Sequence, residues 1–214
     1  MDTSPITLRN SKLGPRVVRA LENRRFEAWY FDETAAAVEK ALALIPREHV
    51  VSWGGSLTVD GLELQKLLEE RGNRLIDRDK AASREERIEL MRQALLCDTF
   101  LCGANAISED GQLVNIDGNG NRAAAMIFGP RQVIVMAGIN KVVKTAADAM
   151  ARARTIASPL NVQRFAALKT PCNETGSCAD CLSADSICNY IVTTRRCNPP
   201  GRIKVILVGR TLGL

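Results

Sequence analysis

Apolar residues along this chain fall into two alternating patterns, short continuous runs and longer stretches with a helical period. Continuous apolar runs are typical of strands that are buried on both faces. We predict such strands at residues 49–53, 74–77, 99–103, 112–116, 132–137 and 202–208. The 3.6-residue period and the capping residues predict helices at 15–31 and 33–45, after Asp60 and after Ser83, and at 145–157. This alternation predicts an α/β fold, in which a mostly parallel sheet has helices on both faces.

Residues 158–200 break the pattern, because proline, asparagine and cysteine replace the periodic apolar positions. Such a segment buries too little apolar surface to hold a fixed structure by itself, so a bound metal is the expected stabiliser. We therefore expect a single domain over residues 1–214, with a Cys-rich irregular excursion at 158–200.

Charge and hydropathy narrow the classes of partner. The chain has 29 Lys and Arg against 24 Asp and Glu, a mild excess that favours an anionic ligand. No basic stripe with interleaved aromatic residues occurs, so nucleic-acid binding is not expected. No apolar run approaches the length of a membrane span, and the N-terminal sequence lacks the apolar core of a signal peptide. A cytoplasmic location is therefore expected.

The cysteines carry the sharpest chemical hypothesis. Cys178 and Cys181 form a C-x2-C pair, which Cys172 and Cys188 flank. Thiolates are the soft ligands that zinc and iron–sulfur clusters select, and cytoplasmic thiols stay reduced, which disfavours the alternative of disulfides. We predict that a metal or cluster is bound by Cys172, Cys178, Cys181 and Cys188. The sequence leaves open whether it is zinc or an iron–sulfur cluster, and whether Cys197 replaces Cys188.

Three glycine-containing loops follow predicted strands, which is where open α/β sheets bind their ligands. Backbone N–H groups, hydroxyls, amides and cationic side chains in these loops indicate a pocket for a phosphate or carboxylate. The candidate anion-binding residues are Gly54, Gly55, Ser56, Thr58, Asn105, Asp117, Asn119, Arg122, Asn140 and Lys141. The alternatives are a tight turn, a polar hairpin with a solvated arginine, and a surface lysine. With one histidine and no Gly-Lys-Ser/Thr motif, the sequence identifies no catalytic residue.

The segments VSWGGSLT, FLCGANAISEDGQLVNIDGNGNRAAAMIFGP and VIVMAGINKVV, together with the cysteine segment, closely resemble the LUD (lactate utilization) domain family, formerly a domain of unknown function. The likeness extends from about residue 10 to residue 214. It implies a fold like ribose-phosphate isomerase, glucosamine-phosphate deaminase and the CoA-transferases. Their phosphate loop is similar to residues 54–58, and their strand-ending lysine is similar to Lys141.

The resemblance also implies a function, because relatives are implicated in oxidising lactate to pyruvate within iron–sulfur electron-transfer complexes. Cluster-bearing relatives carry C-x2-C-x2-C runs, whereas this chain has C-x5-C-x2-C-x6-C. We expect a LUD-type protein that binds a small anionic substrate, a hydroxy acid such as lactate, and carries a Cys-ligated metal or iron–sulfur centre. It would act as a subunit or accessory of an oxidoreductase system, with redox partner subunits.

The first alternative is a non-redox enzyme of isomerase or CoA-transferase type, acting on a sugar phosphate or acyl-CoA, in which the cysteine loop is purely structural. Its acid or base would be Asp117, Glu109 or Asp110, although the chain has no clear counterpart of the CoA-transferase glutamate. A regulatory binding module is the third hypothesis, and the lack of a preceding helix-turn-helix with a basic face disfavours it. A homodimer is the default oligomeric expectation.

Overall fold

The computed structural model describes residues 4–214. The helical elements are α1 (Pro5–Asn23), α2 (Thr34–Ala43), α3 (Leu57–Gly61), α4 (Leu64–Glu70), η1 (Arg78–Lys80), α5 (Arg84–Gln93), η2 (Ala94–Leu96), α6 (Asn121–Ile127), η3 (Ile139–Lys141), α7 (Ala146–Arg152), η4 (Ala153–Ala157), α8 (Ser158–Val162) and α9 (Pro171–Thr175). The strands are β1 (Glu27–Phe31), β2 (Val50–Trp53), β3 (Arg74–Ile76), β4 (Thr99–Gly103), β5 (Ala106–Ser108), β6 (Leu113–Asp117), β7 (Gln132–Gly138), β8 (Val142–Val143), β9 (Tyr190–Thr194) and β10 (Ile203–Val208).

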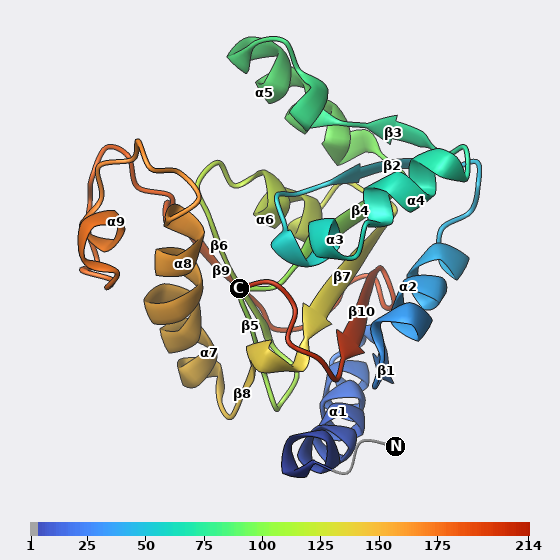
Figure 1. Cartoon of the computed structure of the whole chain (residues 1–214). Coiled ribbons are helices and arrows are strands. Elements are labelled where there is room, and N and C mark those ends of the chain that lie inside the picture. Colours follow the sequence, from blue (N-terminus) through green and yellow to red (C-terminus); the bar gives the residue numbers. More distant parts are fainter. Residues whose placement is uncertain (1–3) are drawn as a thin grey trace.

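The main sheet has six strands in the order β1-β10-β7-β4-β2-β3, and every pair is parallel (Figure 1). All residues of β4 and β7 are buried, which explains why these strands read as continuous apolar runs. The predicted α/β class is thus confirmed.

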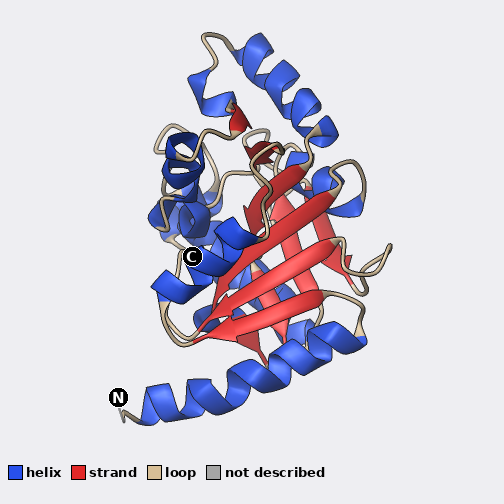
Figure 2. Ribbon diagram, turned by 90° about the vertical axis from the view of Figure 1, so that its right-hand side faces the viewer, coloured by secondary structure: helices blue, strands red, loops and turns tan. Residues whose placement is uncertain are grey.

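Helices cover both faces of this sheet, as the strand pattern requires. Val133, Val135 and Ala137 of β7 belong to one apolar cluster, which also includes Val17 and Leu21 of α1. Ile134 and Met136 belong to a second cluster, which α2 and α4 complete. Successive side chains of a strand point to opposite faces, so β7 contributes to both clusters. Figure 2 shows α1 running as a long helix alongside the sheet.

A second sheet, in the order β8-β5-β6-β9, lies between the main sheet and helices α7 and α8 (Figure 1). β6 pairs antiparallel with β5 and with β9. β9 returns the cysteine segment to the body of the protein, with Asn115 opposite Val192. Residues 158–200 therefore form an excursion that is attached at both ends, by α8 and by β9.

Several elements differ from the sequence-based expectation, among them the short strands β5 and β8, which were not predicted. The helix predicted at 15–31 ends at Asn23, and Glu27–Phe31 form strand β1 instead. β1 pairs with β10 along the edge of the sheet, and this tertiary pairing overrides the helical reading of the local sequence. The strand β9 was not predicted, because its half-exposed residues obtain their partner only from β6.

The helix predicted at 145–157 is interrupted. It begins as α7, passes through the π-helical turn η4 and continues as α8. Single π-helical turns inside α-helices are frequent near functional sites. Among residues 4–214, no helix is long and apolar enough to cross a membrane.

Candidate functional site: an anion pocket beside the cysteine segment

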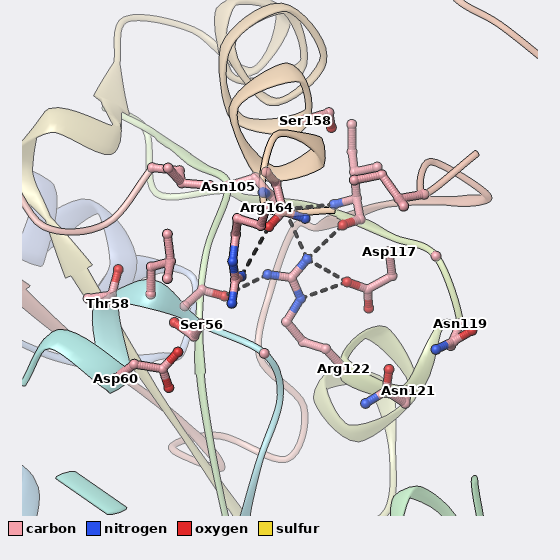
Figure 3. A pocket seen from close by; sticks show the side chains of 18 of the residues that line it. Ser56, Thr58, Asp60, Asn105, Asp117, Asn119, Asn121, Arg122, Ser158 and Arg164 are labelled. Carbon is pink, nitrogen blue, oxygen red and sulfur yellow. Dashed lines mark hydrogen bonds and ion pairs between the residues drawn. The ribbon is translucent and has the colours of Figure 1, made fainter. Parts of the chain in front are cut away.

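A cavity of about 430 Å³ opens at the carboxyl ends of the parallel strands β2 and β4. The loop 55–58 and residues 103–105 form one side, and Asp117 and Arg122 form the floor. Ser158 and Arg164, in and just after α8, form the opposite wall (Figure 3), and Ile187 of the cysteine segment also lines the cavity. The position agrees with the general rule that open α/β sheets bind ligands at the carboxyl ends of their strands.

Eight of the ten predicted anion-binding residues line this cavity. They are Gly55, Ser56, Thr58, Asn105, Asp117, Asn119, Arg122 and Lys141. Gly54 lies behind the lining, where a Cβ atom would come 3.3 Å from Cβ of Arg122. Asn140 does not line the cavity either. Its Oδ1 accepts a hydrogen bond from Leu212 N at 3.1 Å, which holds the C-terminal segment.

Lys141 is the most buried cation of the pocket, with 4 % of its surface exposed. Its Nζ donates to Thr58 Oγ1 at 2.9 Å, and no carboxylate of the described chain lies within ion-pairing distance. Burial, together with the positive charges of Arg152 and Arg122, lowers the pKa of Lys141 to about 8. A buried ammonium group without an anion is unfavourable, so this position favours a negatively charged ligand.

Gly103 allows the two sides of this cationic corner to meet. A Cβ atom at Gly103 would lie 2.8 Å from Ser56 Oγ and 3.7 Å from Lys141 Nζ. Ser56 Oγ accepts a hydrogen bond from Val59 N at 3.3 Å, which fixes the turn into α3. The Ser56 hydroxyl and the Lys141 ammonium thus form a compact pair of donors, while the Thr58 hydroxyl donates to the Leu212 carbonyl at 3.4 Å.

Arg122 takes a different role from the bidentate clamp that the sequence predicted. Its Nε donates to Asp117 Oδ1 at 2.8 Å, and its Nη2 donates to the same oxygen, to Asn105 Oδ1 and to the carbonyl of Ile116 (Figure 3). The second oxygen of Asp117 accepts from Ala123 N at 2.7 Å. Because protein acceptors already occupy Nε and Nη2, Arg122 shapes the pocket floor, and Nη1, which donates to the Gly103 carbonyl at 3.5 Å, has one N–H left for a ligand.

Several lining residues were missed at the sequence level. The segment after β3 supplies Arg78 and Asp79, α8 supplies Ser158 and Asn161, and Arg164 follows α8. Arg78 follows a strand that was predicted, so extending the strand-end rule to every parallel strand would have identified it. Nothing in the sequence places Arg164 here, because its position depends on the packing of the second sheet.

The four predicted metal ligands are free thiols that are partly exposed. Burial raises the pKa of Cys188, a hydrogen bond with Ser158 lowers it, and the neighbouring Cys172, Cys178 and Cys181 raise it. The four thiols are thus close enough to interact electrostatically. Even so, in the region 4–214 no group of three or more His, Cys, Asp or Glu side chains has an arrangement that could hold a metal ion.

Cys197 lies elsewhere. It is fully buried in the apolar cluster beneath the main sheet, where its Sγ donates to Pro199 O and accepts from Ile203 N. The structure therefore groups Cys188, and not Cys197, with the other three cysteines.

The cysteine segment forms part of the pocket wall on both sides of Cys188. Ile187 lines the cavity, and its Cα lies 3.5 Å from the Cβ position of Gly118. Asn189 Nδ2 donates to the Gly118 carbonyl at 3.1 Å. Ser158, the hydrogen-bond partner of Cys188, lines the same cavity. Any change in the conformation of the cysteine segment thus reaches the ligand pocket directly.

The chain belongs to the LUD domain family, whose model matches residues 15–208. Its fold is similar to the crystal structure of a DUF162 family protein from Deinococcus radiodurans, with a TM-score of 0.53, 13 % sequence identity, and coverage of 93 % of this chain and 98 % of that chain. No curated protein matches the chain.

Two solved structures of ribose 5-phosphate isomerase A are similar to a smaller part of this chain. The enzyme from Neisseria gonorrhoeae gives a TM-score of 0.34 at 15 % identity, over 53 % of this chain and 54 % of that chain. The enzyme from Methanocaldococcus jannaschii gives 0.35 at 18 % identity, over 54 % and 56 %.

The geometry of Arg122 predicts a structural cost. Replacing Arg122 with Ala leaves the buried Asp117 carboxylate with one backbone donor, and breaking such a pair costs about 3–5 kcal/mol. We expect the free energy of unfolding, measured by urea denaturation, to fall by that amount. The double variant Arg122→Met with Asp117→Asn should recover a large part of the loss, because no unpaired charge is left. A loss below about 1 kcal/mol for Arg122→Ala would contradict a structural role.

Proposed function

We propose that the protein binds a small organic anion, a hydroxy acid such as lactate, in the strand-end pocket. The observation that carries this proposal is the buried Lys141 ammonium, which has a hydroxyl but no carboxylate beside it among the described residues. In such a pocket the substrate carboxylate supplies the missing negative charge, and the hydroxyl of Ser56 orients it. Asp117 is already neutralised by Arg122, so it does not compete for this cation.

We further propose that Cys172, Cys178, Cys181 and Cys188 bind a metal centre in the cysteine segment. The donor set fits a soft metal, since all four thiols are unpaired and none of them belongs to the main apolar core. An iron–sulfur cluster would supply one-electron transfer next to the pocket, whereas zinc would only cross-link the segment. The position of Cys188 between two residues that contact the Gly118 loop supports a working connection between this centre and the substrate.

Together these sites favour a component of an oxidoreductase system over a non-redox isomerase or CoA-transferase. The non-redox alternative needs an acid or base beside the substrate. Glu109 pairs with Lys144 at 2.8 Å and Asp110 pairs with Arg24, and neither lines the cavity. Asp117 is engaged by Arg122, so these three acids are either remote or already occupied. Asp60 and Lys141, which also line the cavity, are the groups that would have to serve that chemistry.

The proposal predicts a characteristic pH dependence of binding. Lactate keeps its charge above pH 5, so the titrating group is Lys141, whose pKa is about 8. The affinity, measured by isothermal titration calorimetry with L-lactate, should be constant between pH 6 and 7.5. Above about pH 8 it should fall roughly tenfold per pH unit, because the ammonium loses its proton. An affinity that stays constant up to pH 9.5 would exclude the protonated lysine as the anion partner.

Replacing Lys141 with Met tests the same residue independently. We expect lactate binding to be lost while the melting temperature is unchanged or higher, because a buried cation without a carboxylate partner is removed. Lys144→Met is the matched control, since Lys144 is exposed, pairs with Glu109 and lies outside the cavity. The affinity of the Lys144→Met variant for lactate should stay within twofold of that of the parent protein. Equal effects of the two substitutions would show a nonspecific loss of positive charge.

The metal hypothesis is tested on protein purified without oxygen. Cys178→Ser should lower the metal content, measured by elemental analysis, and should make residues 165–200 more sensitive to protease, because the segment has few apolar contacts of its own. Cys197→Ala is the control, and its metal content should equal that of the parent. Metal-free parent protein, or a loss in the Cys197 variant alone, would refute the ligand assignment. A brown colour would identify a cluster, and a colourless protein with bound zinc would remove the redox role.

A further inference from the structure

The side chain of Arg78 is a buried cation in the pocket that has almost no acceptor. Only 13 % of its side-chain surface is exposed, and its Nε has no hydrogen-bond partner in the described chain. Its one hydrogen bond within residues 4–214 is from Nη1 to the thioether of Met91, at 3.5 Å. A thioether is a weak acceptor, whereas a guanidinium has five donors. Buried donors without acceptors are rare in proteins, and an unoccupied ligand site is one physical explanation.

The nearest carboxylate does not satisfy this group. Asp79 Oδ1 lies 3.9 Å from Arg78 Nε, but it lies 2.7 Å from Nη2 of Arg87, which therefore holds it. Asp60 and Asp117 face Arg78 at longer range, and Asp117 is paired with Arg122. Arg78 and Arg87 thus face Asp79 and Asp60 on this side of the cavity, but Arg78 itself donates no hydrogen bond to a carboxylate within residues 4–214.

Arg78 and Lys141 flank the same short loop. A Cβ atom at Gly55 would lie 2.8 Å from Arg78 Nη2, so the guanidinium rests against the loop backbone at this glycine. Lys141 Nζ is bonded to Thr58, three residues further on. The Cα atoms of Gly55 and Thr58 are at most about 10 Å apart, and both cations line the same cavity, so they face one ligand-sized space.

The cavity is large enough for a ligand longer than a three-carbon hydroxy acid. A three-carbon hydroxy acid has six non-hydrogen atoms, and each water takes about 30 Å³ in the liquid. In a volume of about 430 Å³ such a ligand would leave much of the cavity to water and would reach only one of the two cations. A longer acid with a second charged group would fill more of the space and would engage both.

We infer that the pocket recognises a small organic acid with two separated anionic groups, one bound at Lys141 and the other at Arg78. This inference rests on the proposed function of the pocket as a site for a hydroxy acid, and it narrows the substrate class. The second group is a carboxylate or a phosphoryl group, since both accept two parallel hydrogen bonds from a guanidinium.

The test compares three probes by isothermal titration calorimetry on the full chain at pH 7. L-lactate carries one anionic group, L-malate adds a second carboxylate, and 3-phosphoglycerate adds a phosphoryl group. We expect at least one of the two longer acids to bind at least tenfold more tightly than lactate, and the better one identifies the second group. Inorganic phosphate should bind more weakly than the better acid, because it reaches only one cation at a time.

The variants assign this selectivity to a residue. Arg78→Met removes the buried charge and leaves an apolar side chain beside Met91, so the protein should fold. The ratio of malate or phosphoglycerate affinity to lactate affinity should fall at least tenfold. Arg78→Lys should restore part of the ratio, because it keeps the charge and loses the planar fork. Arg92→Met is the control, since Arg92 is exposed on α5 and lies outside the cavity. In this variant the ratio of malate or phosphoglycerate affinity to lactate affinity should be unchanged.

Each outcome separates the two claims. If lactate binds as tightly as the longer acids, or if the preference survives in Arg78→Met, the inference is wrong and the proposed function stands. If Arg164→Met removes the preference and Arg78→Met does not, the second group is bound from α8, and the assignment to Arg78 is wrong. If none of the probes binds, the proposed function fails, and the inference fails with it.

Discussion

The ion pair between Asp117 and Arg122 is the interaction on which the rest of the site depends. Asp117 ends β6 of the second sheet, Arg122 lies in the first turn of α6, and the same guanidinium reaches Asn105 after β4. One buried charge pair therefore joins the second sheet, α6 and the main sheet at the pocket floor. Because Asp117 and Arg122 neutralise each other, Asp117 is not available to pair with the other cations of the cavity.

This charge distribution explains how the pocket keeps two cations that no carboxylate of the described chain fully neutralises. Lys141 is buried with a hydroxyl partner, and Arg78 is buried against a glycine and a thioether. Burying either cation costs free energy, and the parallel sheet provides the stability that offsets this cost. Such unfavourable groups are expected where a ligand completes the electrostatics.

The cysteine segment belongs to the same site, although it begins as an excursion from the domain. α8 and β9 attach its two ends, and Ile187 and Ser158 contribute to the pocket wall between them. A segment with so few apolar contacts depends on its attachments for its conformation. Its state, whether metal-bound or free, is therefore coupled to the shape of the pocket by direct contact.

The sequence alone determined the α/β class, because continuous apolar strands between amphipathic helices leave few other arrangements. It also determined which loops would line the cavity, since the strand-end rule needs only the order of the elements. Eight of ten predicted residues line the cavity for that reason. The exceptions, Gly54 and Asn140, lie next to lining residues, and the sequence cannot tell which of two neighbours faces inward.

Only the tertiary structure decided what depends on pairing between distant segments. β1 and β9 exist because β10 and β6 offer them edges, and a local pattern carries no record of such a partner. The same holds for Arg122, whose engagement by Asp117 and Asn105 turned a predicted ligand clamp into the pocket floor. It holds again for Arg78 and Arg164, which enter the cavity from elements far apart in the chain. Local patterns determine which side chains are available, whereas long-range packing determines which of them are already satisfied and which are left for a ligand.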